Sequence, residues 1–393
     1  MTTGAAASRP RIAMVSVGID RIQRGFERYY SGLFGVLRDH VDITLFKCGG
    51  AANSGQRIPR LFRPVQALAS ALPLGGLVGG GEYRTYKRDC LALGLSLLPE
   101  LLYGAYDIVQ CVDPPLAAVL DRLQRRFHFP PRLLFTEGSL MPAPAYPSGA
   151  HIHHVAQAAY REALIMGVPE SRMTLVPCGY DAGRFAAKPD RGELRARHGI
   201  PESTFVILVV SAVKRIHKRV HYVIDEVSRL DGDVLLWIDG NPEDPAVLEI
   251  AFRKLGPRCR ITHVPSVDVP ELYRLADVFA HGALEESFGL AVVEAMSSGL
   301  PVLVHDSPHF EWLTEDREFL VDMRVTGNLA LRLRQTMNRR EEFRRRAQER
   351  APRVQQRFDW RALAPAYVEM YRKVAASVVT EAEDGREVAY GRS

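Results

Sequence analysis

Two successive series of strand and helix patterns constrain this chain more than any other feature. Short apolar runs rich in β-branched residues alternate with segments whose apolar residues recur at helical spacing. Strands that alternate with helices predict a mostly parallel sheet covered on both faces. The first series has predicted strands at residues 12–17, 43–46, 107–112, 132–136 and 173–176, and the second has them at 205–210, 234–238, 261–264, 278–281 and 301–304.

The polar segment 188–198 separates the two series and marks a domain boundary. A chain of 393 residues is also longer than one hydrophobic core usually supports. We predict a Rossmann-like domain at 1–185, a second at 186–358, a C-terminal helix at 359–379 that packs back on the first domain, and a disordered tail at 380–393. Two doubly wound domains of this kind would face each other across a cleft, with ligands at the carboxyl ends of the strands.

Composition excludes several classes of protein. The formal net charge of +5 is too small to predict nucleic-acid binding, although it suits anionic ligands or an anionic membrane surface. We interpret the basic run at 339–346, which alternates with glutamates, as a solvated helix face. The five cysteines show neither metal-ligand spacing nor a disulfide pattern, which fits a reducing compartment. Without a signal peptide or a long apolar run, we expect a cytoplasmic protein, soluble or peripheral at the inner face of a membrane.

Residues 286–301 carry the most chemical information. Gly289 precedes a predicted helix, and the N–H groups of that helix's first turn favour an anion such as a diphosphate. Glu286 and Glu294, eight residues apart, can accept hydrogen bonds from different hydroxyls of one polyhydroxy ligand. The alternative is a pair of ordinary surface glutamates. Because Glu294 lies in a largely apolar helix, where a carboxylate needs a partner, we favour the ligand site.

This segment resembles the E-x7-E motif of the family-4 glycosyltransferases, which are retaining enzymes of the GT-B fold. Residues 176–185 resemble that family's interdomain signature, with Cys178 in place of the usual Asn. Residues 24–28 resemble its N-terminal Gly-rich loop, and Gly299-Leu300-Pro301 follow in the family's order. The resemblance implies a nucleotide-sugar donor, retention of anomeric configuration, and no obligate metal or other cofactor.

The resemblance also implies a role for each matching residue. Glu294 would bind the ribose of the nucleotide, and Glu286 the hydroxyls of the transferred sugar. Gly25 would lie against the diphosphate from the N-terminal domain. The loop and helix start would hold the sugar and diphosphate through Ser287, Phe288, Gly289 and Leu290.

The basic turn at 214–218 would supply cations to the departing phosphates. The family usually has an Arg and a Lys five apart, whereas Lys214 and Lys218 are four apart, so either Lys214 or Arg215 could accompany Lys218. The alternative is a solvated loop.

The roles of Glu137 and of the histidines at 151–154 need separate interpretation. Glu137 stands where many relatives have a histidine near the donor sugar, and it could contact the sugar, contact the acceptor or cap a turn. The histidines at 151–154 lack convincing ligand spacing, and we interpret them as strand and loop surface rather than a metal site.

The acceptor is not identified by the sequence. Arg60, Phe62, Arg63 and the apolar run 72–78 could touch an anionic membrane and a lipid-linked acceptor, or form a packed helix pair and a loop; we prefer membrane contact. The glycines at 79–81 are interpreted as a loop. Alternative functions are a non-catalytic binding protein with the same fold and a sugar-nucleotide epimerase. A Rossmann dehydrogenase is excluded because no G-x-G-x-x-G follows the first strand.

Overall fold

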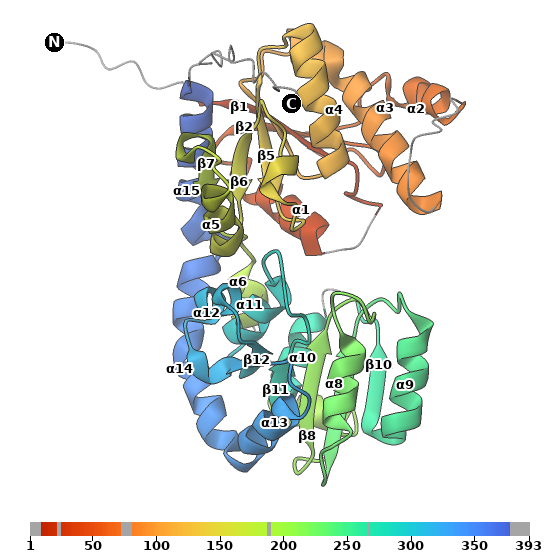
Figure 1. Ribbon diagram of the computed structural model, residues 1–393, viewed down its shortest axis with the longest axis vertical. Helices are drawn as coiled ribbons and strands as arrows, with labels where there is room; N and C mark the ends of the chain where they lie inside the picture. The colour runs from red at the N-terminus through yellow and green to blue at the C-terminus, as the bar shows by residue number, and fades with distance from the viewer. Residues whose placement is uncertain (1–8, 22–24, 72–80, 187–189, 266–267, 378–393) are drawn as a thin grey trace, which may run out of the picture.

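The computed structural model describes residues 9–21, 25–71, 81–186, 190–265 and 268–377. These residues form two α/β domains, one above the other in Figure 1. Each domain is built on a parallel sheet with helices packed around it, so the predicted fold class is confirmed.

In the described residues, the N-terminal sheet has seven strands in the order β3-β2-β1-β4-β5-β6-β7. The order reverses at β1, as in a doubly wound fold. The strands are β1 Arg11–Ser16, β2 Asp42–Lys47, β3 Gln56–Arg57, β4 Ile108–Cys111, β5 Arg132–Glu137, β6 His151–His154 and β7 Met173–Leu175. The helices are α1 Gly25–Leu37, α2 Phe62–Ala71, α3 Gly81–Tyr103, α4 Pro114–Phe127, α5 Gln157–Ile165 and α6 Ala182–Ala186.

The C-terminal sheet, as far as the structure describes it, has six strands in the order β10-β9-β8-β11-β12-β13. They are β8 Phe205–Val210, β9 Val234–Asp239, β10 Cys259–Thr262, β11 Val278–Ala280, β12 Val302–His305 and β13 Leu320–Val321. The helices are α7 Arg191–Arg197, α8 Val220–Val227, α9 Pro245–Leu255, α10 Val269–Leu275, α11 Leu290–Ser297, α12 Pro308–Thr314, α13 Asn328–Asn338, α14 Arg340–Phe358 and α15 Trp360–Ala376. Strand β8 is buried almost throughout, which explains its unbroken apolar sequence.

The last two helices run from one domain to the other. Helix α14 lies along the C-terminal domain, and α15 continues beside the N-terminal domain, where it packs on α1 (Figure 1). Between them, the backbone of Tyr180 exchanges hydrogen bonds of 3.1 Å with Phe358 and Trp360. The two segments that cross between the domains are thereby held together.

Close packing at this crossing requires a glycine. A Cβ added at Gly179 would lie 2.2 Å from the Trp360 ring, which is far inside van der Waals contact. The Trp360 ring also stacks on Tyr29 of α1, with centroids 5.7 Å apart. The glycine of the interdomain signature therefore admits an indole that anchors α15 to the N-terminal domain.

The basic run at the start of α14 is only partly a solvated face. Arg339 and Arg345 pair with exposed glutamates as interpreted, but for the other arginines that interpretation was wrong. Arg340 and Arg344 bind the buried carboxylate of Asp277, while Arg346 and Arg350 bind that of Asp316. The sequence pattern does not reveal these partners because they lie 30 or more residues away along the chain. The run fastens α14 to its own domain.

Two histidines of β6, His153 and His154, are core residues rather than surface residues, which corrects the second interpretation, while His151 is half-buried. His153 is fully buried and is hydrogen-bonded to Thr136 and the Val176 carbonyl, while His154 lies between the rings of Tyr146 and Tyr160. Burial lowers the pKa of His153 to about 3 and that of His154 to about 4, so both are neutral at pH 7.

The region proposed to touch a membrane is a packed helix pair, α2 on α3. Phe62 is 2% exposed and belongs to the core, so it cannot insert into a lipid surface. Gly81 begins α3 instead of belonging to a loop, while residues 72–80 lie outside the described ones.

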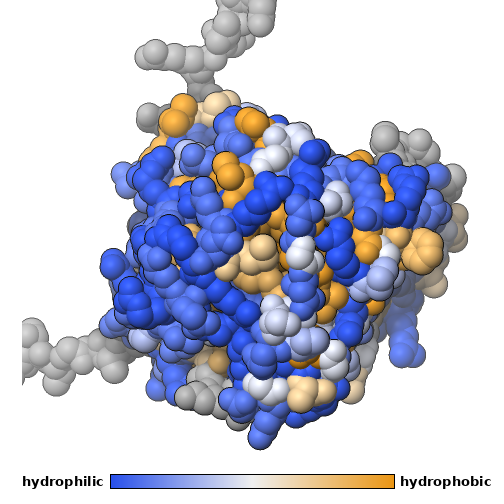
Figure 2. All heavy atoms as spheres, turned by 90° about the horizontal axis from the view of Figure 1, so that it is seen from below, coloured by the Kyte–Doolittle hydropathy of each residue, from blue (hydrophilic) through white to orange (hydrophobic). Residues whose placement is uncertain are grey.

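No helix in the described part of the chain is long and apolar enough to cross a membrane. Seen from below in Figure 2, the surface is mostly hydrophilic, and hydrophobic residues gather near the middle of the view.

Candidate functional site

A buried ion pair stands where strands β8 and β11 end. Glu286, 7% exposed, follows β11, and Lys218 lies in the turn after β8. The Lys218 ammonium donates a hydrogen bond to Oε1 of Glu286, and Nε2 of His281 lies 2.8 Å from the same oxygen. Because β8 and β11 are neighbours in a parallel sheet, their following loops meet at one edge. The structure thus brings together Glu286 and Lys218, both predicted site residues.

The surroundings of Glu286 favour its ionised form. Burial raises the pKa of this carboxyl, but the hydrogen bond and charge of His281 and those of Lys218 outweigh burial. The resulting pKa lies well below the ordinary value of 4.5. Glu286 is therefore a carboxylate at neutral pH, able to accept hydrogen bonds from hydroxyl groups.

Helix α11 begins directly after this loop, as predicted. Gly289 precedes it with φ 93°, a left-handed conformation that favours glycine, and no side chain caps the helix. Phe288 packs against Trp312 and Phe358, and its carbonyl oxygen lies 3.0 Å from Nε2 of the buried His309. These contacts fix the loop, so the N–H groups at the start of α11 form a preorganised anion site.

Glu294 lies one helical turn further along α11 and connects the two domains. Its Oε2 accepts a hydrogen bond of 2.9 Å from the Tyr273 hydroxyl, and its Oε1 lies 3.3 Å from Nη1 of Arg28. Burial raises the pKa of Glu294, while Arg28 and Tyr273 act in the opposite direction. A buried carboxylate with few partners is suited to bind additional hydroxyl donors.

The start of α1 faces the start of α11 across the two domains. A Cβ added at Gly25 would lie 3.8 Å from the Leu290 side chain. Two helix N-termini, one from each domain, therefore approach the same place, and a residue without a side chain stands at this contact.

Two predicted cations do not reach Glu286 or Glu294 in this structure. The ammonium of Lys214 lies 2.9 Å from Glu243, and the guanidinium of Arg215 lies 2.6 Å from Asp244. Of the predicted cations in this basic turn, Lys218 is the one joined to a predicted carboxylate of the site.

Glu137 adopts a capping arrangement, one of the alternatives considered for it. Its Oε1 accepts hydrogen bonds from the backbone N–H groups of Ser139, at 2.9 Å, and Met141, at 3.1 Å. The side chain is 1% exposed, and burial raises its pKa. These contacts shape the loop that follows β5.

Three side chains of the site were not predicted: His281, Tyr273 and Arg28. The sequence carried a signal for two of them, since His281 ends an apolar strand and Arg28 lies in the segment compared with the Gly-rich loop. Tyr273 carried none, because a tyrosine within an apolar helix is most often a core residue.

No group of His, Cys, Asp and Glu in the described ranges could hold a metal ion.

Residues 190–354 match the family model described as Glycosyl transferases group 1. The chain is 28% identical over 242 residues to D-inositol 3-phosphate glycosyltransferase of Kineococcus radiotolerans, a match that covers 55% of each protein. It is 31% identical over 145 residues to the Mycobacterium bovis protein of the same name, covering 35% of this chain and 30% of that protein. The chain thus spans about half the length, or less, of these curated relatives.

Solved structures are similar in fold over a larger share of the chain. Sucrose-phosphate synthase of Thermosynechococcus elongatus has a TM-score of 0.76 at 18% identity, covering 94% of this chain and all of that one. HepE of Anabaena, in complex with UDP and glucose, has a TM-score of 0.71 at 16% identity over 93% of this chain and all of that one. The fold is GT-B. The C-terminal domain, which matches the family model, is also the domain that holds Glu286 and Glu294.

Proposed function

We propose that this protein is a retaining glycosyltransferase of family 4, which moves a sugar from a nucleotide-diphosphate donor to an acceptor. The observation that carries the proposal is the Lys218–Glu286 ion pair beside the uncapped start of α11, in the domain that matches the family model. The curated relatives are glycosyltransferases by name, and the fold is that of HepE, whose structure contains UDP and glucose.

In this proposal the donor's parts meet different groups. Glu294 accepts hydrogen bonds from the ribose hydroxyls, and Glu286 accepts them from the transferred sugar. The start of α11 and Lys218 face the diphosphate, while Gly25 lets the N-terminal domain approach it. Uridine diphosphate is the first donor nucleotide to test, because the HepE structure contains it.

The chemistry follows from the charges. The bond between the anomeric carbon and the diphosphate oxygen breaks, a bond to an acceptor oxygen forms on the same face, and the acceptor's proton passes to the departing diphosphate. Negative charge grows on the departing diphosphate while the sugar becomes oxocarbenium-like. The ammonium of Lys218, once turned toward the donor, and the helix N–H groups directed at that charge stabilise the transition state.

A thermal-shift panel of UDP, GDP, ADP and their sugar conjugates tests the proposal. A ligand that binds the native state raises the melting temperature by mass action, by an amount that grows with ligand concentration. We expect one nucleotide family to stabilise the wild type and to stabilise Glu294→Gln far less, with about tenfold weaker affinity.

Glu285→Gln is the matched control, because Glu285 is the exposed neighbour of Glu286 and contacts nothing in the site. It should retain the wild-type response. If a nucleotide stabilises the protein but neither sugar transfer nor donor hydrolysis occurs, the binding-protein alternative replaces the enzyme. If no nucleotide shifts the melting temperature, the donor-site assignment is wrong.

A further inference from the structure

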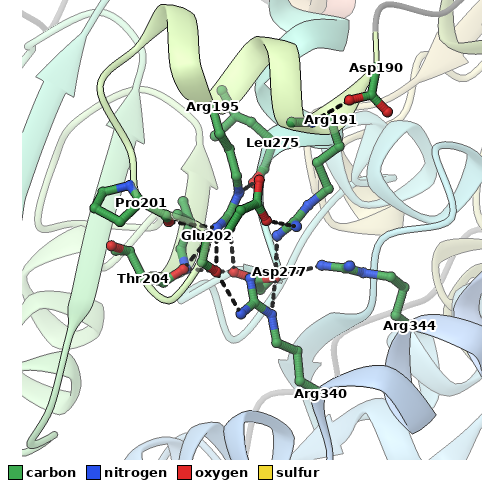
Figure 3. A network of polar contacts seen from close by, with 12 residues as sticks. Asp190, Arg191, Arg195, Pro201, Glu202, Thr204, Leu275, Asp277, Arg340 and Arg344 are labelled. Atoms are coloured by element: carbon green, nitrogen blue, oxygen red, sulfur yellow. Dashed lines mark hydrogen bonds and ion pairs between the residues drawn. The ribbon is translucent and has the colours of Figure 1, made fainter.

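A second cluster of charge lies at the opposite end of the C-terminal sheet. Asp277 immediately precedes β11, and its side chain is completely buried. Four guanidinium groups contact this one carboxylate at 2.6–2.7 Å, two from α7 and two from α14 (Figure 3): Arg191, Arg195, Arg340 and Arg344. The backbone N–H of Val206 also donates to it, at 2.8 Å.

The cluster holds more positive charge than its carboxylates balance. Two other carboxylates form ion pairs with these arginines: Glu202 lies 3.4 Å from Arg191, and Glu341 lies 3.7 Å from Arg344. Their side chains are 67% and 81% exposed. Ion pairs between exposed side chains offset little of the cluster's positive charge, because water screens the interaction. Burial lowers the pKa of Arg191 to about 10, Asp277 opposes this, and the neighbouring guanidiniums act in the same direction as burial.

The four arginines are not equivalent. Arg195 is fully buried and donates to the backbone carbonyls of residues 201, 202, 204 and 275, so it serves the structure. Arg191, Arg340 and Arg344 are 20–22% exposed and reach the surface. In addition, Nε of Arg191 and Nη2 of Arg340 are buried without a hydrogen-bond acceptor. Arg191 and Arg340 therefore each have an unpaired donor, and the cluster as a whole has positive charge to spare.

A second carboxylate that is bound by arginines of the same helix provides the contrast. Asp316 binds two arginines of α14, Arg346 and Arg350, and Glu318 also pairs with Arg346. Counting Arg339, which lies 3.8 Å from Glu318 and also pairs with Glu342, three cations there meet three carboxylates. Fastening α14 to the domain thus does not require an excess of arginine, and the excess at Asp277 calls for another explanation.

We propose that Arg191, Arg340 and Arg344 form a binding site for a small phosphate-bearing anion, separate from the donor site. Arginines from two helices suit the oxygens of a phosphate, since each guanidinium offers several donors in one plane. The partly buried position of the three arginines fits a small soluble anion better than a flat membrane surface. Such a ligand would join α7 to the start of α14, the helix that continues to the crossing between the domains.

Calorimetric titration with inorganic phosphate tests the site. Saturating UDP occupies the donor site, and sodium chloride keeps the ionic strength constant so that screening does not vary. We expect saturable phosphate binding to the wild type and about tenfold or greater weakening in Arg344→Gln. Arg350→Gln removes the same charge from the balanced pair on the same helix and should retain phosphate affinity within about twofold.

A measurement on the unmodified protein guards against a variant that fails to fold. Phosphate should slow amide hydrogen exchange in residues 191–204 and 340–344 but not around 286–294. The proposal is overturned if the wild type binds no phosphate, if both variants weaken it equally, or if exchange slows at 286–294 alone. Binding to phosphatidic acid vesicles without binding to phosphate would overturn the soluble-anion assignment.

Discussion

The two ends of the C-terminal sheet each hold a buried carboxylate beside strand β11, and they are neutralised differently. At the carboxyl end, Glu286 has one ammonium and two imidazoles as partners, with His281 at 2.8 Å and His217 at 3.9 Å. At the amino end, Asp277 has four guanidiniums. Strand β11 itself has only three residues, or roughly 10 Å.

The kind and number of cations around each carboxylate fit the role of its site. The Lys218 ammonium is a compact charge on a flexible stem, and it can turn from Glu286 toward a ligand. The arginines around Asp277 come from two helices whose positions depend on that contact, and Arg195 cannot move without leaving several carbonyls unpaired. The Glu286 site can exchange partners, whereas the Asp277 site joins two helices and holds more arginine than that joining requires.

Asp277→Asn should give the largest loss of stability. It leaves four clustered guanidiniums without their central charge, and breaking a buried ion pair costs about 3–5 kcal/mol. Urea unfolding should show this decrease in the free energy of unfolding. Asp231→Asn is the control, since Asp231 is an exposed carboxylate in the turn before β9. Similar stability in both variants would mean that the Asp277 cluster does not stabilise the domain.

Glu286→Gln should have an intermediate effect on stability, about 1–3 kcal/mol, because hydrogen bonds between charged groups are lost. Since the pKa of Glu286 is lowered in the folded state, its ionised form contributes stability above the ordinary value of 4.5. That contribution disappears as pH falls through the lower, folded-state pKa. The difference between wild type and variant, measured by urea unfolding from pH 7 to pH 3, should therefore shrink in acid.

The same variant should also lower sugar transfer by about 100-fold, the effect of removing a group that binds the transition state. A constant stability difference across the pH range would contradict the ionised state assigned to Glu286. Wild-type turnover would remove Glu286 from the site.

Replacing Lys214 should have the smallest effect. Its ion pair with Glu243 is partly exposed, so Lys214→Met should change the free energy of unfolding by less than about 1 kcal/mol. Donor affinity, measured by calorimetry, should also change little, whereas Lys218→Met should weaken it by about tenfold or more. Equal losses of affinity in the two variants would show that Lys214 moves to the donor when it binds.

Local patterns were sufficient for most strands of the fold, although β3, β6 and β13 were not predicted. Buried parallel strands read as unbroken apolar runs, and β8 was predicted to the residue because it is buried almost throughout. The start of α11 was predicted for a similar reason, since Gly289 next to an apolar helical pattern indicates a helix boundary. Proximity along the chain also placed Glu286 and Glu294 in one segment.

Contacts between residues that lie far apart along the chain could not be predicted from the sequence. The α14 arginines looked solvated because helical spacing shows neighbouring glutamates but not carboxylates 30 to 67 residues away. The histidines of β6 looked exposed because nothing local shows that a polar strand is covered by α15 and aromatic rings.

The sequence by itself determined two α/β units, the order of their strands along the chain and the segment that carries the two glutamates. These follow from interactions within a few residues, which periodicity records. Only the tertiary structure decided which cation meets which carboxylate: Lys218 rather than Lys214 for Glu286, Arg28 from the other domain for Glu294, and four arginines for Asp277. Charges act through space, and the folded sheets decide which of them are close enough to pair.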